Sequence, residues 1–450
     1  MDPVIARYAR RAAPRYTSYP TAPHFRPDFE EAELRRWLGG LAVDDPVSLY
    51  LHVPFCRKMC WYCGCNMKLA RRYEPVADYV ESLLAHLALT ADALPGRMAV
   101  SHLAWGGGTP TSLTPGDLTR VMEAVRERFD IREGSELAIE VDPRTLSPEM
   151  ATRLGALGFT RASFGVQEFD PQVQQVINRV QPPEMVEAAT QAMRKAGVGE
   201  ISYDLIYGLP FQTVESLRRT VIQATGMGPQ RIALFGYAHV PWMAKNQRMM
   251  PEEALPGPGE RAAQAEAAAE TLEALGYERV GLDHFALPDD PMAVAARAGT
   301  LRRNFQGYTT DTAETLLGLG ATAITKTPDG FAQNLTETGA WARTVAQGRL
   351  PVARGLGVDA DDRLRAWVIE RLMCDFEVDL AAVPARFPEA PADWAEEALE
   401  RLVELRADGM VEIAGSRVRM TPRGRPLVRV AASAFDARLA RSEARHSLAV

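Results

Sequence analysis

Four of the five cysteines in the chain lie within ten consecutive residues. The segment CRKMCWYCGC, residues 56–65, contains Cys56, Cys60, Cys63 and Cys65, and the remaining Cys374 stands alone. Structural zinc usually takes two cysteine pairs from separate chain segments, so zinc is the weaker alternative here. The C-x3-C-x2-C spacing within one loop suits three corners of a 4Fe-4S cubane. The sequence therefore predicts an iron–sulfur cluster in which one iron has no protein ligand.

A glycine run follows the next predicted strand. WGGGTPT, residues 105–111, stands at a strand-to-loop transition, where glycines let the backbone approach a ligand closely. A plain tight turn is the alternative for such a run by itself. An open iron can chelate the amino and carboxylate groups of S-adenosylmethionine (SAM), and reductive cleavage of SAM yields a 5'-deoxyadenosyl radical. The cysteine loop and the glycine run together predict this cofactor.

The elements that must position these residues form a regular pattern. Six short apolar runs succeed one another: VSLYLHV, VSHLAWGGG, ELAIEVD, RASFGVQEF, ISYDLIYGLP and RIALFGYAHV. The segments between them begin near Ser, Thr or Pro and have apolar residues at helical spacing. Strands alternating with helices predict a parallel sheet, either doubly wound or closed into a complete or partial barrel.

Polar residues at the carboxyl ends of these strands favour the barrel. They are the cysteines, GGGT, Glu140 with Asp142, Gln167 with Glu168, Asp204, and Tyr237 with His239. In a barrel these strand ends converge on one mouth. We therefore expect an α/β fold built on a partial (β/α)6 TIM-like barrel, with the site at its mouth.

The chain of 450 residues is long enough for a large domain and a smaller one. We expect an N-terminal arm over residues 1–45, the barrel over 46–330 and a mainly helical domain over 331–450. In the last segment, helices followed by a short hairpin and a final helix predict a winged-helix-like arrangement. The glycines of LRRNFQGYTTDTAETLLGLGATAIT indicate loops or close approaches of the backbone.

Composition limits the location and the partners of the protein. No run approaches the roughly 20 apolar residues that cross a bilayer, and the start has no apolar core of a secretory signal. Clustered cysteines favour a reducing compartment, so we expect a cytoplasmic protein without a membrane span; four arginines in the first fifteen residues leave an organelle transit peptide as the alternative. A net charge of −7 argues against nucleic-acid binding.

Motifs along almost the whole chain resemble the oxygen-independent coproporphyrinogen III oxidase family of the radical SAM superfamily. They are APRYTSYPTAPHF, LYLHVPFCRKMCWYCGCN, WGGGTPT, IEVDPR, SFGVQEF, INRVQ, YDLIYGLP, RNFQGYTT and a C-terminal domain that ends in TPRGRPLVR. The superfamily pattern matches Cys56, Cys60 and Cys63, with Tyr62 in the aromatic position. Cys65 is one thiol more than a three-cornered cubane needs, and it narrows the resemblance to this family.

The resemblance implies roles for individual residues. Cys56, Cys60 and Cys63 hold the cluster. The residues that contact a first SAM would be Tyr50, Tyr62, Gly107, Gly108, Thr109, Glu140, Ala238 and Ile324, and Glu140 would bind the ribose hydroxyls. The residues that bind a second SAM would be Gln167, Arg179 and Asp204. Cys65 and Gln306 are implied as catalytic residues, and Phe305 lies beside Gln306. From the residues alone, Ala238 and Ile324 are as well explained as core, and the polar groups as a hydrogen-bonded barrel rim.

The family's reaction is the oxidative decarboxylation of two propionates of coproporphyrinogen III to vinyl groups, which gives protoporphyrinogen IX in haem biosynthesis. It implies a reductant such as flavodoxin or ferredoxin, an unknown electron acceptor and a monomer. Four substrate propionates need cationic partners, and the candidates are Arg15, Arg302 and Arg303, for which a solvated charge run is the alternative. The RYTSYP arm is expected to cover the cavity and exclude water.

Other functions remain open from the sequence. The winged-helix-like tail would suit a redox-sensing nucleic-acid regulator, which needs a basic recognition face. Paralogues of the superfamily include haem-trafficking proteins and anaerobic haem-degrading methyltransferases, and the trafficking paralogues usually lack Cys65 and the RYTSYP arm. His52 is expected to pack or to hydrogen-bond near the cluster, and Cys374 to be a buried apolar side chain.

Overall fold

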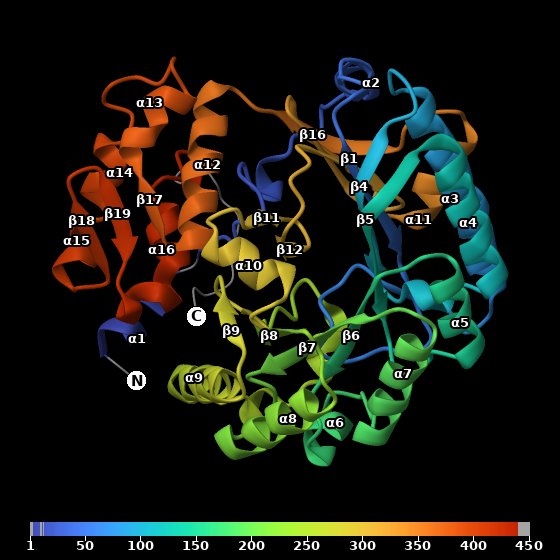
Figure 1. Ribbon diagram of the computed structural model, residues 1–450, viewed down its shortest axis with the longest axis horizontal. Coiled ribbons are helices and arrows are strands. Elements are labelled where there is room, and N and C mark those ends of the chain that lie inside the picture. The colour runs from blue at the N-terminus through green and yellow to red at the C-terminus, as the bar shows by residue number, and fades with distance from the viewer. Residues whose placement is uncertain (1–2, 10, 12, 440–450) are drawn as a thin grey trace.

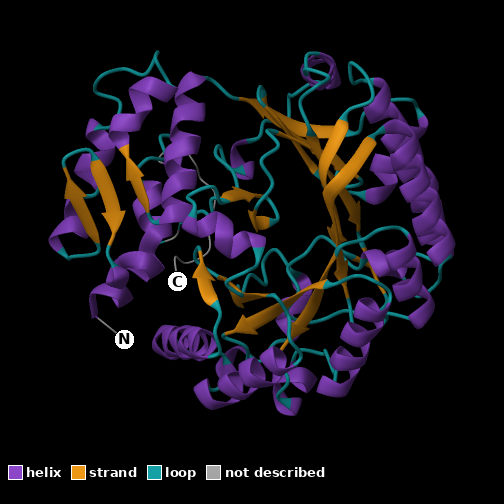
Figure 2. Ribbon diagram, in the orientation of Figure 1, coloured by secondary structure: helices purple, strands orange, loops and turns teal. Residues whose placement is uncertain are grey.

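The protein is built around one long curved sheet with helices on its outer face (Figures 1 and 2). The computed structural model describes residues 3–9, 11 and 13–439. Six parallel strands follow one another in space in chain order, namely β1 (Val47–Val53), β4 (Ala99–Gly107), β5 (Asp130–Val141), β6 (Arg161–Gln167), β7 (Glu200–Tyr207) and β8 (Arg231–Gly236). The predicted partial barrel of six β/α units is confirmed.

Helices cover the outside of the barrel and join its strands. They are α3 (Glu74–Asp92), α4 (Pro115–Arg128), α5 (Pro148–Ala156), α6 (Pro171–Val176), α7 (Pro183–Lys195), α8 (Val214–Gly226) and α9 (Pro258–Ala274). The start signals act as predicted: Thr114, Ser147 and Thr213 each accept a hydrogen bond from a backbone N–H in the first turn. Proline follows two of these caps, where its missing N–H costs nothing.

The sheet continues beyond the six predicted strands at both edges. Beside β1 lie β13 (Thr315–Leu319, parallel), then β14 (Ile324–Thr327), β15 (Gly330–Asn334) and β16 (Val352–Gly357), with α11 (Thr338–Ala346) between the last two in sequence. Beside β8 lie β10 (His284–Ala286) and β9 (Glu278–Val280), followed along the chain by α10 (Pro291–Arg297). Two short pairs stand apart from this sheet, β2 (Phe55–Cys56) with β3 (Lys68–Leu69), and β11 (Arg302–Asn304) with β12 (Gly307–Thr309).

These edge strands were not predicted, and the glycines of the segment that contains β13 were interpreted as loops or close approaches of the backbone. At Gly318 in β13 the backbone of Ile324 comes so close that a Cβ would lie 2.5 Å from the Ile324 carbonyl oxygen. The glycine therefore permits close approach within a strand. Residues 331–357 were expected in the C-terminal domain. In the structure they contribute β15, α11 and β16, and both strands belong to the barrel sheet. The domain boundaries themselves stay a prediction.

A mainly helical C-terminal domain stands beside the barrel (Figure 1). It contains α12 (Ala360–Asp375), α13 (Val383–Arg386), α14 (Glu396–Arg401), α15 (Val403–Ala407) and α16 (Val428–Ser433) around a small sheet of β17 (Glu377–Asp379), β19 (Arg417–Met420) and β18 (Val411–Ala414). The predicted hairpin is present as β18 and β19. Residues 396–407 carry four glutamates against two arginines, so α14 and α15 do not form the basic face that a nucleic-acid regulator needs.

The N-terminal arm divides its contacts between the two parts of the molecule. Helix α1 (Pro3–Ala9) and the segment after it pack on the C-terminal domain, where Tyr8, Tyr16 and Tyr19 share an apolar cluster with Leu372. Helix α2 (Glu31–Gly39) packs on the barrel core through Trp37. Within the described residues, no helix combines the length and the apolar character that crossing a membrane requires.

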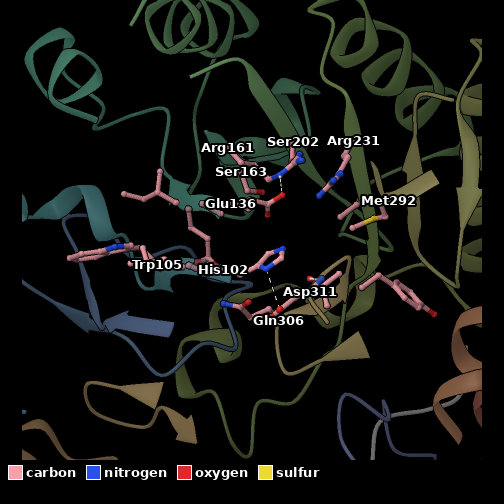
Figure 3. Close-up of a pocket in the computed structure, with 18 of the residues that line it drawn as sticks. His102, Trp105, Glu136, Arg161, Ser163, Ser202, Arg231, Met292, Gln306 and Asp311 are labelled. Atoms are coloured by element: carbon pink, nitrogen blue, oxygen red, sulfur yellow. Dashed lines mark hydrogen bonds and ion pairs between the residues drawn. The ribbon is translucent and has the colours of Figure 1, made fainter. Parts of the chain in front are cut away.

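Ion pairs close the end of the barrel at the amino termini of its strands (Figure 3). His102 Nδ1 lies 3.1 Å from Asp311 Oδ1, and Arg161 Nε lies 3.2 Å from Glu136 Oε2. Arg231 Nε lies 2.7 Å from an oxygen of Asp290, which caps α10. This floor, made of His102, Glu136, Arg161, Arg231, Asp290 and Asp311, places charges of opposite sign next to one another in the interior.

The His102–Asp311 pair makes stability depend on pH. Burial lowers the pKa of His102, but the hydrogen bond and the charge of Asp311 outweigh burial and raise that pKa above its ordinary value. A raised histidine pKa stabilises the fold fully below about pH 6.5, and the contribution is lost as the pH rises through the folded-state pKa. We expect His102→Gln to destabilise the protein by about 1–2 kcal/mol at pH 6 and by clearly less at pH 8.5, as measured by thermal unfolding.

His239→Gln is the matched control, because the partner of His239 is Glu252, a side chain that is 67% exposed. Exposed ion pairs contribute little to stability. An equal loss of stability for His102→Gln at both pH values would contradict the assignment of the charge to His102.

Candidate functional site

The cysteine loop begins at the carboxyl end of β1, at the mouth of the barrel. Cys60 is buried, Cys56 and Cys63 are partly buried, and Cys65 is exposed. The Cys65 backbone N–H donates to Cys63 Sγ at 3.4 Å. Within the described residues, no three His, Cys, Asp or Glu side chains already stand together as a metal site. The four thiols lie on one loop, and ligation of a cluster would need their side chains to turn toward a common centre.

Two adjacent amide side chains hold this loop from outside. Asn246 Nδ2 lies within hydrogen-bond distance of three loop carbonyls, those of Cys60 (3.1 Å), Trp61 (3.2 Å) and Cys63 (2.8 Å). Gln247 Nε2 donates to the carbonyls of Tyr62 (2.8 Å) and Ala238 (3.1 Å). Neither Asn246 nor Gln247 was predicted from the sequence as a residue of the site. An Asn-Gln pair has no distinctive spacing, and its contacts join segments about 185 residues apart.

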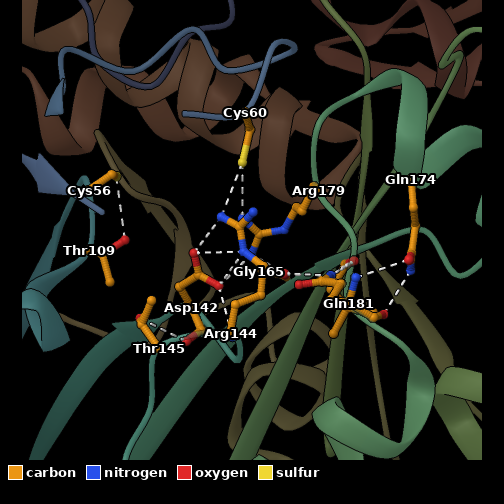
Figure 4. Close-up of polar contacts among 11 residues, drawn as sticks. Cys56, Cys60, Thr109, Asp142, Arg144, Thr145, Gly165, Gln174, Arg179 and Gln181 are labelled. Atoms are coloured by element: carbon orange, nitrogen blue, oxygen red, sulfur yellow. Dashed lines mark hydrogen bonds and ion pairs between the residues drawn. The ribbon is translucent and has the colours of Figure 1, made fainter. Parts of the chain in front are cut away.

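Two guanidinium groups flank the buried thiol (Figure 4). Arg144 and Arg179 each donate to Cys60 Sγ at 3.3 Å. Both also pair with Asp142, at 2.7 Å and 3.5 Å, and the side chains of Arg144, Arg179 and Asp142 are only 4%, 7% and 9% exposed. One carboxylate, Asp142, compensates one of the two positive charges of Arg144 and Arg179, so a net positive charge remains beside the sulfur of Cys60. Positive charge at this place favours an anionic thiolate or cluster.

The glycine run connects the cysteine loop to Glu140. A Cβ at Gly106 would lie 2.7 Å from Glu140 Oε1, and a Cβ at Gly108 would lie 2.8 Å from the backbone of Phe55. Gly107 has a φ of +117°, and its N–H donates to Glu140 Oε2 at 3.1 Å. Thr109 Oγ1 is 3.5 Å from Cys56 Sγ. The run therefore places backbone beside the Glu140 carboxylate and the Thr109 hydroxyl beside the Cys56 thiol. The predicted approach of this backbone to a cofactor stays a prediction.

Glu140 and Asp204 line an internal cavity of about 250 Å³ below the mouth. Both lie deep in the molecule but are open to the cavity. Figure 3 shows Gln306, Ser163 and Ser202 in the lining of the same cavity. Burial and then the charge of Asp204 raise the pKa of Glu140 to about 7, and burial raises the pKa of Asp204 to about 6. Gln306, from the β11–β12 hairpin, lines the same cavity. Among the described residues, no cationic side chain forms an ion pair with Glu140 or Asp204, so both carboxylates are well placed to accept hydrogen bonds from a ligand.

The other predicted residues also gather around this mouth. Arg179 donates to the Gly165 carbonyl at 2.5 Å, and a Cβ at Gly165 would lie 2.7 Å from Gln167 Nε2, so Arg179 and Gln167 are neighbours at the end of β6. Tyr50 pairs through its strand with Gly318, beside which Ile324 lies. Tyr62 and Ala238 both bind Gln247 through their carbonyls. Residues from segments far apart in the chain are thereby brought to one end of the barrel.

Glu168 and Arg302 behave differently from what their position in the sequence suggested, whereas His52 behaves as expected. Glu168 points away from the mouth, is 0% exposed and binds the Gln212 amide at 2.6 Å, because successive strand residues point to opposite faces. Arg302 is paired with Glu314 (3.3 Å) and Glu370 (3.1 Å), which argues against it as a substrate ligand. Burial lowers the pKa of His52 to about 4, and its Nδ1 lies 3.0 Å from the Tyr50 hydroxyl, which confirms a hydrogen-bonding role.

Comparison with known proteins agrees with this geometry. Residues 50–223 match the Radical SAM superfamily, and residues 358–427 match the HemN C-terminal domain. The oxygen-independent coproporphyrinogen III oxidase of Bradyrhizobium diazoefficiens is 47% identical over 443 residues, which cover 98% of either chain. The enzyme of that name from Escherichia coli is 39% identical over 427 residues, covering 94% of this chain and 93% of the relative.

The fold agrees as well. The solved structure of coproporphyrinogen III oxidase (HemN) from Escherichia coli, described as a radical SAM enzyme, superposes with a TM-score of 0.91 at 38% identity and covers 94% of this chain and 98% of that chain. Sequence, domain order and fold lead to one conclusion: the chain belongs to the oxygen-independent coproporphyrinogen III oxidase family of radical SAM enzymes.

Proposed function

We propose that the protein converts two propionate side chains of coproporphyrinogen III to vinyl groups by oxygen-independent oxidative decarboxylation, giving protoporphyrinogen IX for haem biosynthesis. The observation that carries the proposal is one arrangement. A loop of closely spaced thiols, flanked by Arg144 and Arg179, adjoins a cavity lined by Glu140, Asp204 and Gln306. The relatives named above support the choice of this reaction over haem trafficking or haem degradation.

The radical SAM family implies a 4Fe-4S cluster and SAM. Cys56, Cys60 and Cys63 would hold the cluster, and the donor set fits it, because one loop supplies the thiols and two buried guanidinium groups offset its negative charge. When bound, cluster and SAM supply a 5'-deoxyadenosyl radical that removes a hydrogen atom from the β-carbon of a propionate. Loss of carbon dioxide and of one electron then leaves the vinyl group.

The remaining residues would bind and orient these ligands. Gly107, Gly108 and Thr109 would receive the methionyl end of SAM and Glu140 its ribose hydroxyls, since a carboxylate accepts two hydrogen bonds from vicinal hydroxyls. Tyr50, Tyr62, Ala238 and Ile324 would complete the first site. Gln167, Arg179 and Asp204 would hold a second SAM beside it. No residue needs to act as a general base in hydrogen-atom abstraction, so the protein contributes position and exclusion of water.

The four clustered cysteines should fall into two classes. We expect Cys56→Ser, Cys60→Ser and Cys63→Ser to lose most of the iron and sulfide after anaerobic reconstitution and to form no protoporphyrinogen IX. Cys65→Ser should keep its iron and lose product formation, because its thiol is implied in catalysis and not in ligation. Iron analysis and product chromatography on the same samples separate these outcomes.

Cys374→Ala is the control, because Cys374 of α12 is 4% exposed and packs in an apolar cluster with Val280 and Ala286, away from the cysteine loop. It should keep both iron and turnover. Wild-type iron content in Cys60→Ser would overturn the assignment of the cluster ligands.

Asn246 is predicted to determine how well the loop retains the cluster. Asn246→Ala removes the amide that bridges three loop carbonyls, so the loop should become more mobile and lose iron several-fold faster to a chelator. Asn66→Ala is the matched control, since Asn66 lies next to Cys65 but its side chain donates to Thr336 outside the loop. Equal rates of iron release from the two variants would contradict a positioning role for Asn246.

The physiological reductant, the electron acceptor, the monomeric state and the cytoplasmic location stay predictions. Each concerns a partner or a compartment rather than the geometry of the chain. A flavodoxin or a ferredoxin suits the need for a single electron at low potential.

A further inference from the structure

Four arginines from separate parts of the chain lie close together beside the mouth of the barrel. They are Arg15 of the arm, Arg261 of α9, Arg303 of the β11–β12 hairpin and Arg429 of α16. Arg303 donates to the carbonyls of Tyr16 (3.2 Å) and Arg15 (3.3 Å), and Arg429 donates to the carbonyls of Pro14 (3.0 Å) and Ala13. The arm is thus held between the hairpin and the C-terminal domain, with Arg15 at its centre.

The guanidinium groups are near enough to repel one another. Burial, then the charges of Arg15 and Arg303, lower the pKa of Arg429 to about 10. Burial also lowers the pKa of Arg261, and Arg15 acts in the same direction. Burial raises the pKa of the Tyr207 hydroxyl, whereas the charges of Arg261, Arg429 and Arg15 lower it. All three arginines therefore lie near this one tyrosine, and the guanidinium of Arg261 is 5.8 Å from the centre of its ring. Repulsion between buried cations is costly unless an anion compensates it.

Acidic side chains of the described residues compensate the charge of Arg15, Arg261 and Arg303 only in part. Within the described part of the chain, no carboxylate lies within 4.0 Å of the guanidinium groups of Arg15, Arg261 or Arg303. Asp283 acts on Arg303 and Arg15 from further away, and it is hydrogen-bonded to His284 at 2.7 Å. Nη1 of Arg303 is buried without a hydrogen-bond partner. The neighbouring Arg302, by contrast, has two glutamate partners.

The arginines adjoin the cavity of the candidate site. The guanidinium of Arg303 lies 4.3 Å from the centre of the Tyr308 ring, and that ring packs edge-on against His284 at 5.4 Å. Tyr308 and His284 line the cavity together with Gln306, Glu140 and Asp204. Arg261 donates to the Tyr237 carbonyl at 2.8 Å, just beyond the end of β8. An anion held by this cluster would therefore border the place where the reaction is proposed.

We propose that Arg15, Arg261, Arg303 and Arg429 form a carboxylate-binding subsite that holds the propionates of the tetrapyrrole that do not react. The inference rests on the proposed function for the identity of the ligand. The substrate has four propionates and the reaction consumes two, so two carboxylates remain in the product and can stay with the arginines throughout. Guanidinium groups suit them because they bind carboxylates in a bidentate manner. Binding would also tighten the arm over the cavity.

Arg15→Gln is the primary test, because Arg15 is exposed and its side chain makes no hydrogen bond or ion pair with any described residue. The probe is coproporphyrin III, the oxidised tetracarboxylate that cannot turn over, titrated against the reconstituted holoenzyme by fluorescence. We expect Kd to rise about tenfold or more, as for the loss of one charge-assisted hydrogen bond, and to rise further in Arg15→Gln/Arg261→Gln. The tetramethyl ester of the probe should bind wild type and variants alike.

Arg11→Gln is the matched control on the same arm, because Arg11 pairs with Glu404 at 2.7 Å on the C-terminal domain. It should leave Kd unchanged. In turnover, Arg15→Gln should raise KM with little change in kcat, since the non-reacting carboxylates contribute equally to ground and transition state. Retention of wild-type Kd and KM by Arg15→Gln and by the double variant would overturn the subsite.

The subsite and the proposed function fail in different ways. If wild-type holoenzyme binds the probe through these arginines but forms no protoporphyrinogen IX from coproporphyrinogen III, the subsite stands and the proposed reaction is wrong. If wild type turns over normally and both variants match it, the reaction stands and the subsite is wrong.

Discussion

The contacts that Asp142, Arg144 and Arg179 make around Cys60 are the interaction on which the site depends. A buried guanidinium is stable only with a counter-charge, and here one carboxylate and one thiol share two of them. Removing the carboxylate would leave two cations without compensation in the interior. The triad therefore orients Cys60 toward the mouth and, through Arg179, reaches the carboxyl end of β6 at Gly165.

The two ends of the barrel differ in how their polar groups are satisfied. At the floor, His102, Arg161 and Arg231 meet Asp311, Glu136 and Asp290 as opposite charges. At the mouth, Glu140 and Asp204 line a cavity; burial and then the charge of Asp204 raise the pKa of Glu140 to about 7, and burial raises the pKa of Asp204 to about 6. Paired charges stabilise a fold, whereas buried charges without partners are usually kept for a ligand.

The arm and the C-terminal domain complete the mouth rather than standing apart from it. Tyr16 lies in the C-terminal apolar cluster and donates from its hydroxyl to Asp436 at 3.0 Å, while its carbonyl accepts from Arg303 of the hairpin. One short segment is thus fastened to both parts of the molecule. The covering role that the sequence suggested for the RYTSYP motif is compatible with this attachment, and it stays a prediction.

Local sequence determined the six parallel strands, the capped helices between them and the clustering of polar residues at one end, because hydrophobic periodicity and cap residues act over a few positions. It also identified the thiol loop, the glycine run and, through family motifs, most residues that the structure gathers at the mouth. Only the tertiary structure decided that Asn246 holds the loop, that Glu168 points away from the mouth, and that Arg303 lies near Arg429 whereas Arg302 is paired with glutamates. These outcomes depend on contacts between segments far apart in the chain and on the face of a strand or hairpin from which each side chain projects, and neither is encoded in short-range spacing.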